Sequence, residues 1–228
     1  MKRNRMTLAT TAVVALLFLL TLGAPPAPAD IFTSNINTPD TAIAGFPGPY
    51  AQVKVNLTSS TMATITFTSL VNSGNIYLLG DGGSVDVNVN ATSWTLSGIT
   101  GSNAGTGFSP GPWSDAGSGN VNGFGIFNQR IDSFNGLTHS SDTISFTLTN
   151  TSGGTWANAA SVLTPNGSGF DAAAHIFVTS FPANAANGAI NTGFAAEATA
   201  SVPDSGITVM LLGGALVGLA TLRQKFRA

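Results

Sequence analysis

The chain has 228 residues, a formal net charge of −2 and no cysteine. The lack of cysteine excludes disulfides, thiolate nucleophiles, cysteine-ligated zinc and acylation of an N-terminal cysteine. Between the two end segments, Lys54 and Arg130 are the only basic residues, against nine acidic ones. Such a surface repels phosphate, so we expect no nucleic-acid binding.

The first 29 residues have the three regions of a secretory signal peptide. A basic start precedes an apolar run over residues 12–22, and an Ala-x-Ala cleavage site follows at Ala27 and Ala29. We therefore expect signal peptidase to release a chain that begins at Asp30. No Arg-Arg pair is present, which favours the Sec machinery over twin-arginine export. A retained N-terminal anchor is the alternative.

The last part of the chain is a polar motif, an apolar run and a basic tail, and the motif is Val202-Pro203-Asp204-Ser205-Gly206. Residues 207–222 carry no charge and predict a helix of roughly 24 Å, which is short for a bilayer unless basic side chains extend it by snorkelling. The tail that stops the membrane segment contains Arg223, Lys225 and Arg227. With basic residues at both ends, the positive-inside rule leaves both termini cytoplasmic and the middle of the chain outside.

This tripartite tail resembles the C-terminal sorting signal of PEP-CTERM proteins, in the variant with a Val-Pro-Asp-Ser-Gly motif. The resemblance covers about the last tenth of the chain. It implies that an exosortase, a multi-pass membrane enzyme, reads the tail and cuts near the motif. An uncut tail anchor is the alternative. The residues that match the recognition motif are Val202, Pro203, Asp204, Ser205 and Gly206.

These segments divide the chain into a signal peptide (1–29), an extracytoplasmic domain (30–200) and a sorting signal (201–228). The middle part is long enough for one domain with a sizeable core. We expect an inner-membrane intermediate that is then delivered to the cell surface or the extracellular space.

The middle of the chain reads as a series of short strands. Alternation of apolar and polar residues predicts strands at 50–57, 62–68, 84–90 and 143–149, and the turn chemistry around them predicts two hairpins. Further strands are expected at 75–79, 91–99, 124–131 and 172–181, with a weak last strand within 184–200. Residues 100–122 read as the longest loop, and residues 156–163 as ambiguous between strand and short helix.

Many short Thr- and Val-rich strands with Gly and Asn turns indicate an all-β fold. We expect a β-sandwich or jelly-roll-like domain of about eight to ten strands. No fixed-period repeat is visible, which disfavours a solenoid.

Few residues suggest catalysis, so we predict that the protein is not an enzyme. Gly107 to Gly111 match Gly-x-Ser-x-Gly, but a nucleophile elbow needs a following helix, which the next prolines forbid. His139 and His175 form no spaced metal motif. A secreted hydrolase would need two carboxylates, such as Asp132 and Asp142, or an Asp and His175, to meet in one cleft.

Two ligand hypotheses stay open. Asp81, Asp86 and carbonyls of the 80–83 turn can supply oxygen ligands to calcium, although an acidic hairpin turn explains them more simply. Trp113 follows a Gly-rich stretch and can stack on a sugar if it is exposed, whereas core packing is the simpler explanation of Trp94 and Trp156.

Three functions follow from these observations. The favoured one is a non-enzymatic surface or matrix protein, whose β-domain interacts with exopolysaccharide or with copies of itself. The second is a calcium-dependent carbohydrate-binding module, which needs Trp113 exposed and Asp81 and Asp86 convergent. The third is a secreted hydrolase.

Overall fold

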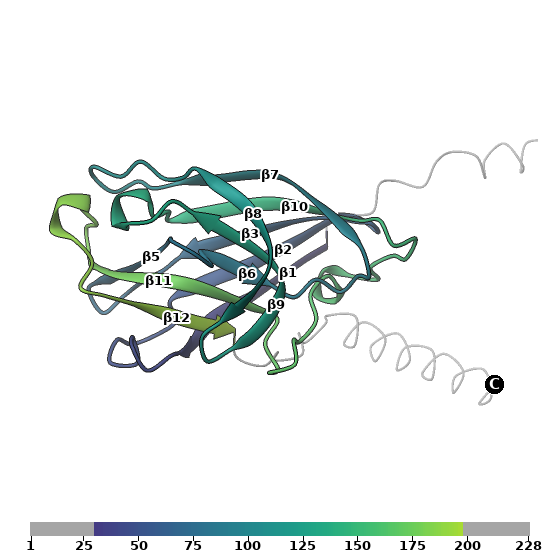
Figure 1. Ribbon diagram of the computed structural model, residues 1–228, viewed down its shortest axis with the longest axis horizontal. Helices are drawn as coiled ribbons and strands as arrows, with labels where there is room; N and C mark the ends of the chain where they lie inside the picture. The colour runs from purple at the N-terminus through teal and green to yellow at the C-terminus, as the bar shows by residue number, and fades with distance from the viewer. Residues whose placement is uncertain (1–29, 198–228) are drawn as a thin grey trace, which may run out of the picture.

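The computed structural model describes residues 30–197, which form a 12-stranded antiparallel sheet and three short 3₁₀ turns (Figure 1). Regular elements run through most of this part of the chain, and no α-helix occurs within it. The elements are β1 (Asp30–Pro39), β2 (Ala51–Ser59), β3 (Met62–Ser69), β4 (Val71–Asn72), β5 (Asn75–Leu79), β6 (Val85–Val87), β7 (Trp94–Ser102), β8 (Trp113–Val121), β9 (Gly125–Ser133), η1 (Leu137–His139), β10 (Thr143–Asn150), η2 (Ala159–Ser161), β11 (Ala172–Ser180), η3 (Ala185–Asn187) and β12 (Asn191–Glu197).

The strands follow one path in the order β7-β10-β3-β2-β1-β12-β11-β6-β9-β8. The first strand, β1, lies in the middle of this path and pairs with β2 on one side and β12 on the other. Strands β5 and β6 both pair with β11, β5 along residues 176–180 and β6 at 172–173. The 80–84 turn therefore lies between two strands that share one neighbour.

The all-β prediction is confirmed, but hydrogen bonds link the strands into one continuous sheet instead of two separate packed sheets. The sheet curls until its two edge strands, β7 and β8, contact each other. The Trp94 indole N–H donates to Gln129 Oε1 at 2.9 Å, which ties β7 to β9. Farther along the same edge, Gly101 of β7 lies against Trp113 of β8, where an added Cβ would lie 2.5 Å from the ring. The sheet is thus nearly barrel-shaped.

Of the strands predicted from alternation, those at 50–57, 62–68 and 143–149 form close to the predicted residues, whereas only Val85–Val87 of the predicted 84–90 strand form β6, and all three are buried. In β3, Ala63, Ile65 and Phe67 are fully buried, and the threonines between them are more exposed. The same period recurs in β10, which pairs with β3 in unbroken register from Thr143↔Thr68 to Thr149↔Met62. Side chains of a strand point alternately to its two faces, so one face of each strand faces the core.

Three strands lie where none is expected, and the shortest of them is the two-residue strand β4. Strand β8 occupies part of the stretch read as the longest loop, and its Gly- and Ser-rich sequence carries almost no apolar pattern. Its backbone pairing with β9 holds it in the sheet, and most of its residues stay exposed. Strand β1 was not expected either, because its inward positions include the polar residue Ser34. The ambiguous 156–163 segment contains the 3₁₀ turn η2 and an isolated antiparallel bridge from Leu163 to Val89.

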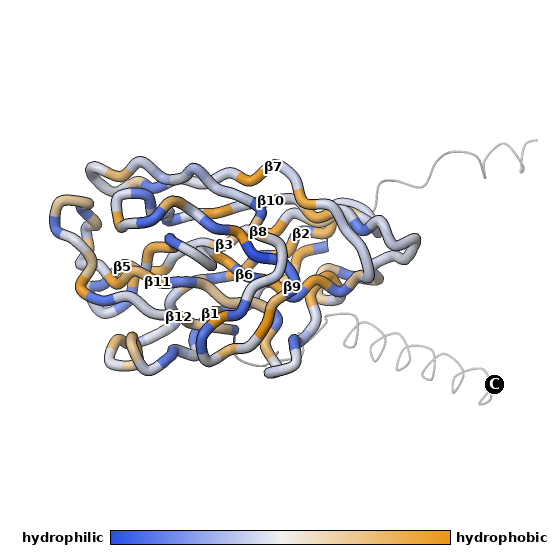
Figure 2. The backbone as a smooth tube through the Cα atoms, in the orientation of Figure 1, coloured by the Kyte–Doolittle hydropathy of each residue, from blue (hydrophilic) through white to orange (hydrophobic). Residues whose placement is uncertain are grey.

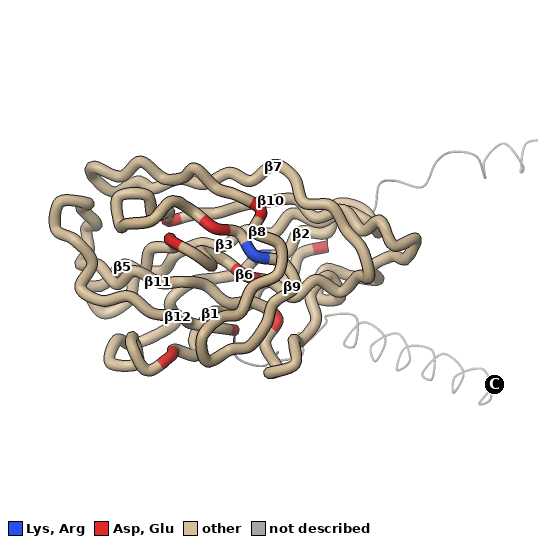
Figure 3. Tube along the Cα trace, in the orientation of Figure 1, with Lys and Arg blue, Asp and Glu red and all other residues tan. Residues whose placement is uncertain are grey.

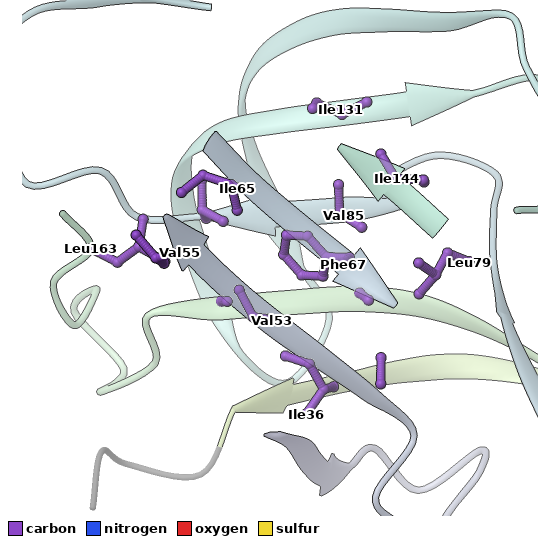
Figure 4. Packing of buried hydrophobic residues seen from close by; sticks show 14 of the residues in the cluster. Ile36, Val53, Val55, Ile65, Phe67, Leu79, Val85, Ile131, Ile144 and Leu163 are labelled. Carbon is purple, nitrogen blue, oxygen red and sulfur yellow. The ribbon is translucent and has the colours of Figure 1, made fainter. Parts of the chain in front are cut away.

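The main hydrophobic core fills the inside of the curled sheet. Figure 4 shows side chains from many strands that meet there, among them Ile65 and Phe67 of β3, Val85 of β6 and Ile131 of β9. In Figure 2 the apolar segments follow the strands, and polar segments alternate with them. Two smaller clusters lie apart from this core, one around Phe124 and Phe127 and one around Leu78 and Phe177.

The connections gather at two opposite ends of the sheet because all strand pairs are antiparallel. One end, here called the loop end, holds residues 40–50, 70–74, 103–112, 134–142 and 181–190. The other, here called the hairpin end, holds residues 59–61, 88–93, 122–124 and 151–171, and β1 begins there at Asp30.

Within residues 30–197 there is no helix long and apolar enough to cross a membrane. The expected signal peptide, the sorting motif and the apolar run at 207–222 lie outside the described residues.

Candidate functional site

The densest group of charged side chains in the described part of the chain surrounds Arg130 (Figure 3). Arg130 of β9 is opposite Asp86 of β6 in the sheet register, so both side chains leave the same face. Its Nε donates to Asp86 Oδ1 at 2.8 Å, and one terminal nitrogen donates to the Asn120 carbonyl at 2.9 Å. Asp132 Oδ1 lies 4.0 Å from the same Nε.

Glycine at two positions makes room for this guanidinium. An added Cβ at Gly119 of β8 would overlap Arg130, and one at Gly83 would lie 2.9 Å from Asp86 Oδ2. Gly83 also has φ +67°, in the left-handed region that other residues rarely adopt. The Gly-rich composition of both segments therefore serves close packing around the ion pair.

The 80–84 turn is held against the end of β9 by several hydrogen bonds. The Gly83 N–H donates to Asp132 Oδ1 at 2.6 Å, and the Asp81 N–H donates to Ser133 Oγ at 3.1 Å. The Ser84 hydroxyl donates to the Asp81 carbonyl at 2.6 Å. Asp81 has φ 65°, which the turn imposes. These bonds fix the position of the turn relative to β9.

The two residues proposed as calcium ligands are each engaged within the protein. Asp81 Oδ1 accepts from the N–H of Gly82 at 2.8 Å, and Asp86 Oδ1 accepts from Arg130. Across residues 30–197, no group of three or more His, Asp or Glu side chains is arranged to hold a metal ion. Calcium binding thus stays a prediction, without a converging ligand set in this part of the chain.

Asp86 is the most deeply buried charged group of the cluster, with no exposed surface. Burial raises the pKa of Asp86 to about 7, although the hydrogen bond and charge of Arg130 act in the opposite direction. Its Oδ2 has no hydrogen-bond partner among the described residues. The carboxylate therefore depends on Arg130 for compensation of its charge.

His175 lies on β11, next to this cluster. Its ring stacks between Phe177 and Phe194, with centroid distances of 5.4 and 4.4 Å. Burial lowers the pKa of His175, with a smaller opposing effect from the charge of Asp81. Its Nδ1 has no hydrogen-bond partner in the described structure, so no carboxylate orients the ring as a general base would require.

The Gly-x-Ser-x-Gly match lies in the connection between β7 and β8. Strand β8 follows it, so the strand–turn–helix context of a nucleophile elbow is not formed. His139 is close to this segment, but its Nδ1 contacts the carbonyls of Ser109 at 2.9 Å and Gly111 at 2.7 Å. This histidine joins two loops at the loop end.

The remaining carboxylates of the hydrolase hypothesis have separate partners. Asp142 accepts from the Ser102 hydroxyl at 2.9 Å and from the Ala104 N–H at 2.7 Å. Asp132 accepts from Gly83, as described above, and no hydrogen bond links it to Asp142 or to His175 in residues 30–197. The absence of catalysis remains a prediction.

Trp113, the candidate for sugar stacking, is at the first position of β8 and packs against the main core. Its indole N–H is buried without a partner in the described region. Trp94 also packs there, and Trp156 is 3% exposed and donates to the Asn90 carbonyl at 2.8 Å. All three tryptophans thus contribute to packing.

A second buried acid, Glu197, was not anticipated from the sequence. It ends β12 opposite Ile36 and is 3% exposed, and neither carboxylate oxygen has a hydrogen-bond partner within the described residues. Burial raises the pKa of Glu197 to about 7; the nearby Ser34 hydroxyl lowers it by less, and the Asp171 charge adds a further increase. The one sign of its burial in the sequence is that it directly follows Ala195 and Ala196, two small apolar residues of β12.

Glu197→Gln is expected to stabilise the protein at alkaline pH. Because the pKa of Glu197 in the folded state is above its ordinary value, the folded state retains a proton that the unfolded state has lost. Stability therefore falls as pH rises from about 4.5 to about 7. The variant should lose this part of the pH dependence and gain on the order of 2 kcal/mol above pH 7.

Urea unfolding of the wild type and Glu197→Gln at pH 5 and pH 8 measures this difference. Asp30→Asn is a matched control, because this exposed carboxylate has no comparable burial. If both variants gain the same free energy of unfolding at pH 8, the effect comes from the protein's net negative charge and not from the burial of Glu197.

No protein-family model, curated protein or solved structure matches this chain.

Proposed function

We propose that the protein is an exported cell-surface or extracellular-matrix protein with a non-enzymatic role in structure or interaction, linked to exopolysaccharide. Sec machinery and signal peptidase act on its N-terminal segment, and an exosortase acts on its C-terminal sorting signal. The two apolar end segments flank a β-domain that is outside the membrane.

The observation that carries this proposal is the pair of end segments in the sequence: a basic, apolar and Ala-x-Ala pattern before Asp30, and a polar motif, uncharged run and basic tail from Val202 onward. The described residues, 30–197, lie between the expected cleavage site at Ala29 and the motif that begins at Val202. Removal of both end segments would leave all the strands of the described region in the chain.

The site geometry supports a non-enzymatic role. The ion pair of Arg130 and Asp86 is enclosed by glycines and backbone, and His175 lies between aromatic rings. A general base needs a proton to abstract within hydrogen-bond reach, and a nucleophile needs a base beside it. The described hydrogen bonds join Arg130 to Asp86 and to the Asn120 carbonyl, and none joins His175 to a carboxylate within residues 30–197.

The test is the intact mass and cell fraction of the protein in its own host. A tag placed between Gly153 and Gly154, in an exposed connection at the hairpin end, avoids both signals and the strands. We expect a mature species that begins at Asp30, lacks everything beyond the region of the motif, and is found at the surface or in the medium. Pro203→Ala with Asp204→Ala should accumulate as a longer membrane form.

A wild-type species that still ends at Ala228 in the membrane fraction would contradict the sorting proposal. The chain would then be a tail-anchored domain, and its function would lie near that membrane. Gln224→Ala is the control for substitution in the tail, because it alters neither the motif nor a basic residue.

A further inference from the structure

We propose that the outer face of β2, β3, β10 and β7 is a binding surface for a hydroxyl-rich polysaccharide. The inference rests on the interaction role proposed above, and it names the surface and the class of partner. These four strands are neighbours in the sheet (Figure 1). Threonine and serine hydroxyls cover their outer face in rows, and no acidic side chain lies among them.

The hydroxyls are aligned from strand to strand. Residues directly opposite each other in antiparallel strands point to the same side, so the pairing defines rows that cross the strands. One row joins Thr64 of β3, Thr147 of β10 and Ser97 of β7. Neighbours in a row lie about 5 Å apart, and successive rows lie about 7 Å apart along the strands. The other rows are Thr66 with Ser145 and Thr100, Thr68 with Thr143 and Ser102, and Met62 with Thr149 and Thr95.

Most of these hydroxyls are available to a ligand. The opposite face of the same strands carries buried residues such as Ile65 and Phe146, so the rows are on the solvent side. Within residues 30–197, side-chain hydrogen bonds join Thr66 to Ser145 at 3.0 Å, Ser145 to the Ile65 carbonyl at 3.2 Å and Ser102 to Asp142 at 2.9 Å. None occupies the row of Thr64 in this part of the chain. Each free hydroxyl can donate one hydrogen bond and accept two.

Strand propensity explains only part of this pattern. Threonine is favoured in strands, but serine is not among the favoured residues, and Ser97, Ser102 and Ser145 also lie in the rows. Exposed cross-strand pairs are often stabilised by aromatic residues or by opposite charges, and the rows on β3, β10 and β7 contain neither. The feature that these positions share is therefore the hydroxyl group, and not the β-branched shape.

Charge separates this face from the rest of the domain. All nine acidic residues between the end segments lie outside the rows. Strand β2 continues the rows with Gln52, Lys54 and Asn56, and Lys54 is the one charged side chain among the row positions of the four strands. The outer face of β6 and β9 carries Asp86 and Arg130 instead. A neutral or an acidic polysaccharide can therefore approach the hydroxyl rows without repulsion.

The chemistry of the rows favours a polysaccharide over other partners. Protein interfaces are enriched in aromatic residues and arginine and depleted in serine, which is the opposite of this composition. A single lysine is too little for binding through phosphate contacts. A polysaccharide carries hydroxyls along its whole length, so one chain can meet several rows. Because each neutral hydrogen bond replaces one with water and contributes little, we expect weak binding of short oligosaccharides and tight binding of the polymer.

Affinity electrophoresis tests this surface. The protein as its host produces it, purified in a mild detergent, is run through native gels that contain the host's purified exopolysaccharide. Thr64→Val with Thr68→Val and Thr147→Val removes three hydroxyls from the rows, and valine is equally favoured in strands, so the sheet should form as before. We expect the affinity for the polymer to fall about tenfold, because several weak contacts are lost together.

Three controls accompany this variant. Thr41→Val with Thr138→Val and Thr155→Val removes the same number of exposed hydroxyls from connections away from the rows and should retain the affinity. Lys54→Gln should change the affinity less than about twofold, because an exposed charge contributes little. Removal of calcium with EDTA should have no effect. Urea unfolding shows that each variant is folded.

The proposal is overturned if the polysaccharide does not retard the wild type, if the row variant binds as tightly as the wild type, or if the control threonine variant loses as much affinity. Loss of binding with Lys54→Gln alone would identify a contact with acidic groups instead of the hydroxyl rows. Loss with EDTA would restore the calcium-dependent module. Surface delivery is measured separately by mass and cell fraction, so a correctly sorted protein that binds no polysaccharide overturns this inference alone.

Discussion

Replacing Arg130 with Met is expected to destabilise the protein by about 3–5 kcal/mol at pH 8, a large fraction of the stability of an ordinary domain. Asp86 has no exposed surface, and its Oδ1 accepts a 2.8 Å hydrogen bond from Arg130. Without the guanidinium, a buried carboxylate is left uncompensated. Urea unfolding followed by tryptophan fluorescence measures the loss.

The loss should shrink at low pH. Burial already raises the pKa of Asp86 to about 7 beside Arg130, and removal of the arginine raises it further. A folded-state pKa above the unfolded one means that protonation at acid pH favours the folded state, and that stability declines as pH rises through this range. The deficit of Arg130→Met should therefore be smaller at pH 5 than at pH 8.

The double variant Asp86→Asn with Arg130→Met is the control for the ion pair. It removes both charges, so it should recover much of the stability lost in the single variant. If the double variant is as unstable as Arg130→Met at pH 8, the arginine stabilises the fold through packing against Gly119 instead of through the charge of Asp86.

Trp113→Ala is expected to destabilise the protein by about 3 kcal/mol, because it empties the space between Gly101 and the core where β7 meets β8. Trp113→Phe should cost far less. It retains an aromatic ring and removes an indole N–H that has no partner within residues 30–197. Thermal or urea unfolding of both variants gives the comparison.

This pair of variants also separates two roles of the tryptophan. A side chain that served only to stack on a sugar would be removed without loss of stability, and its removal would lower retention on a polysaccharide gel. An unchanged unfolding midpoint for Trp113→Ala would therefore contradict the packing role and restore the sugar-binding hypothesis.

The regular strands were predictable because each has its own alternating pattern. Strands β3 and β10 place Ile65, Phe67 and Phe146 inward and hydroxyl-bearing residues outward, so the local sequence determines both the strand and its buried face. Strand β8 has no such pattern. Its place in the sheet depends on pairing with β9, a tertiary interaction that leaves little trace in its Gly- and Ser-rich sequence.

The buried charges were not predictable for a related reason. Asp86 alternates with valines and reads as an outward residue of a hairpin, yet β9 brings Arg130 from 44 residues away to cover it. That Arg130 is one of only two basic residues between the end segments was the one available signal. The Gly-rich loop before Trp113 suggested exposure, whereas the curl of the sheet placed the ring against the core.

The sequence by itself determined the all-β class and most of the strands, because alternation is a local property. Export and sorting stay predictions from the terminal segments, whose hydrophobicity and short motifs are local properties as well. Only the tertiary structure decided that the strands form one curled sheet, that β7 and β8 meet at Trp113, and that Asp86 is paired with Arg130. Those features depend on which distant segments become neighbours, and that choice is made by the packing of the whole domain.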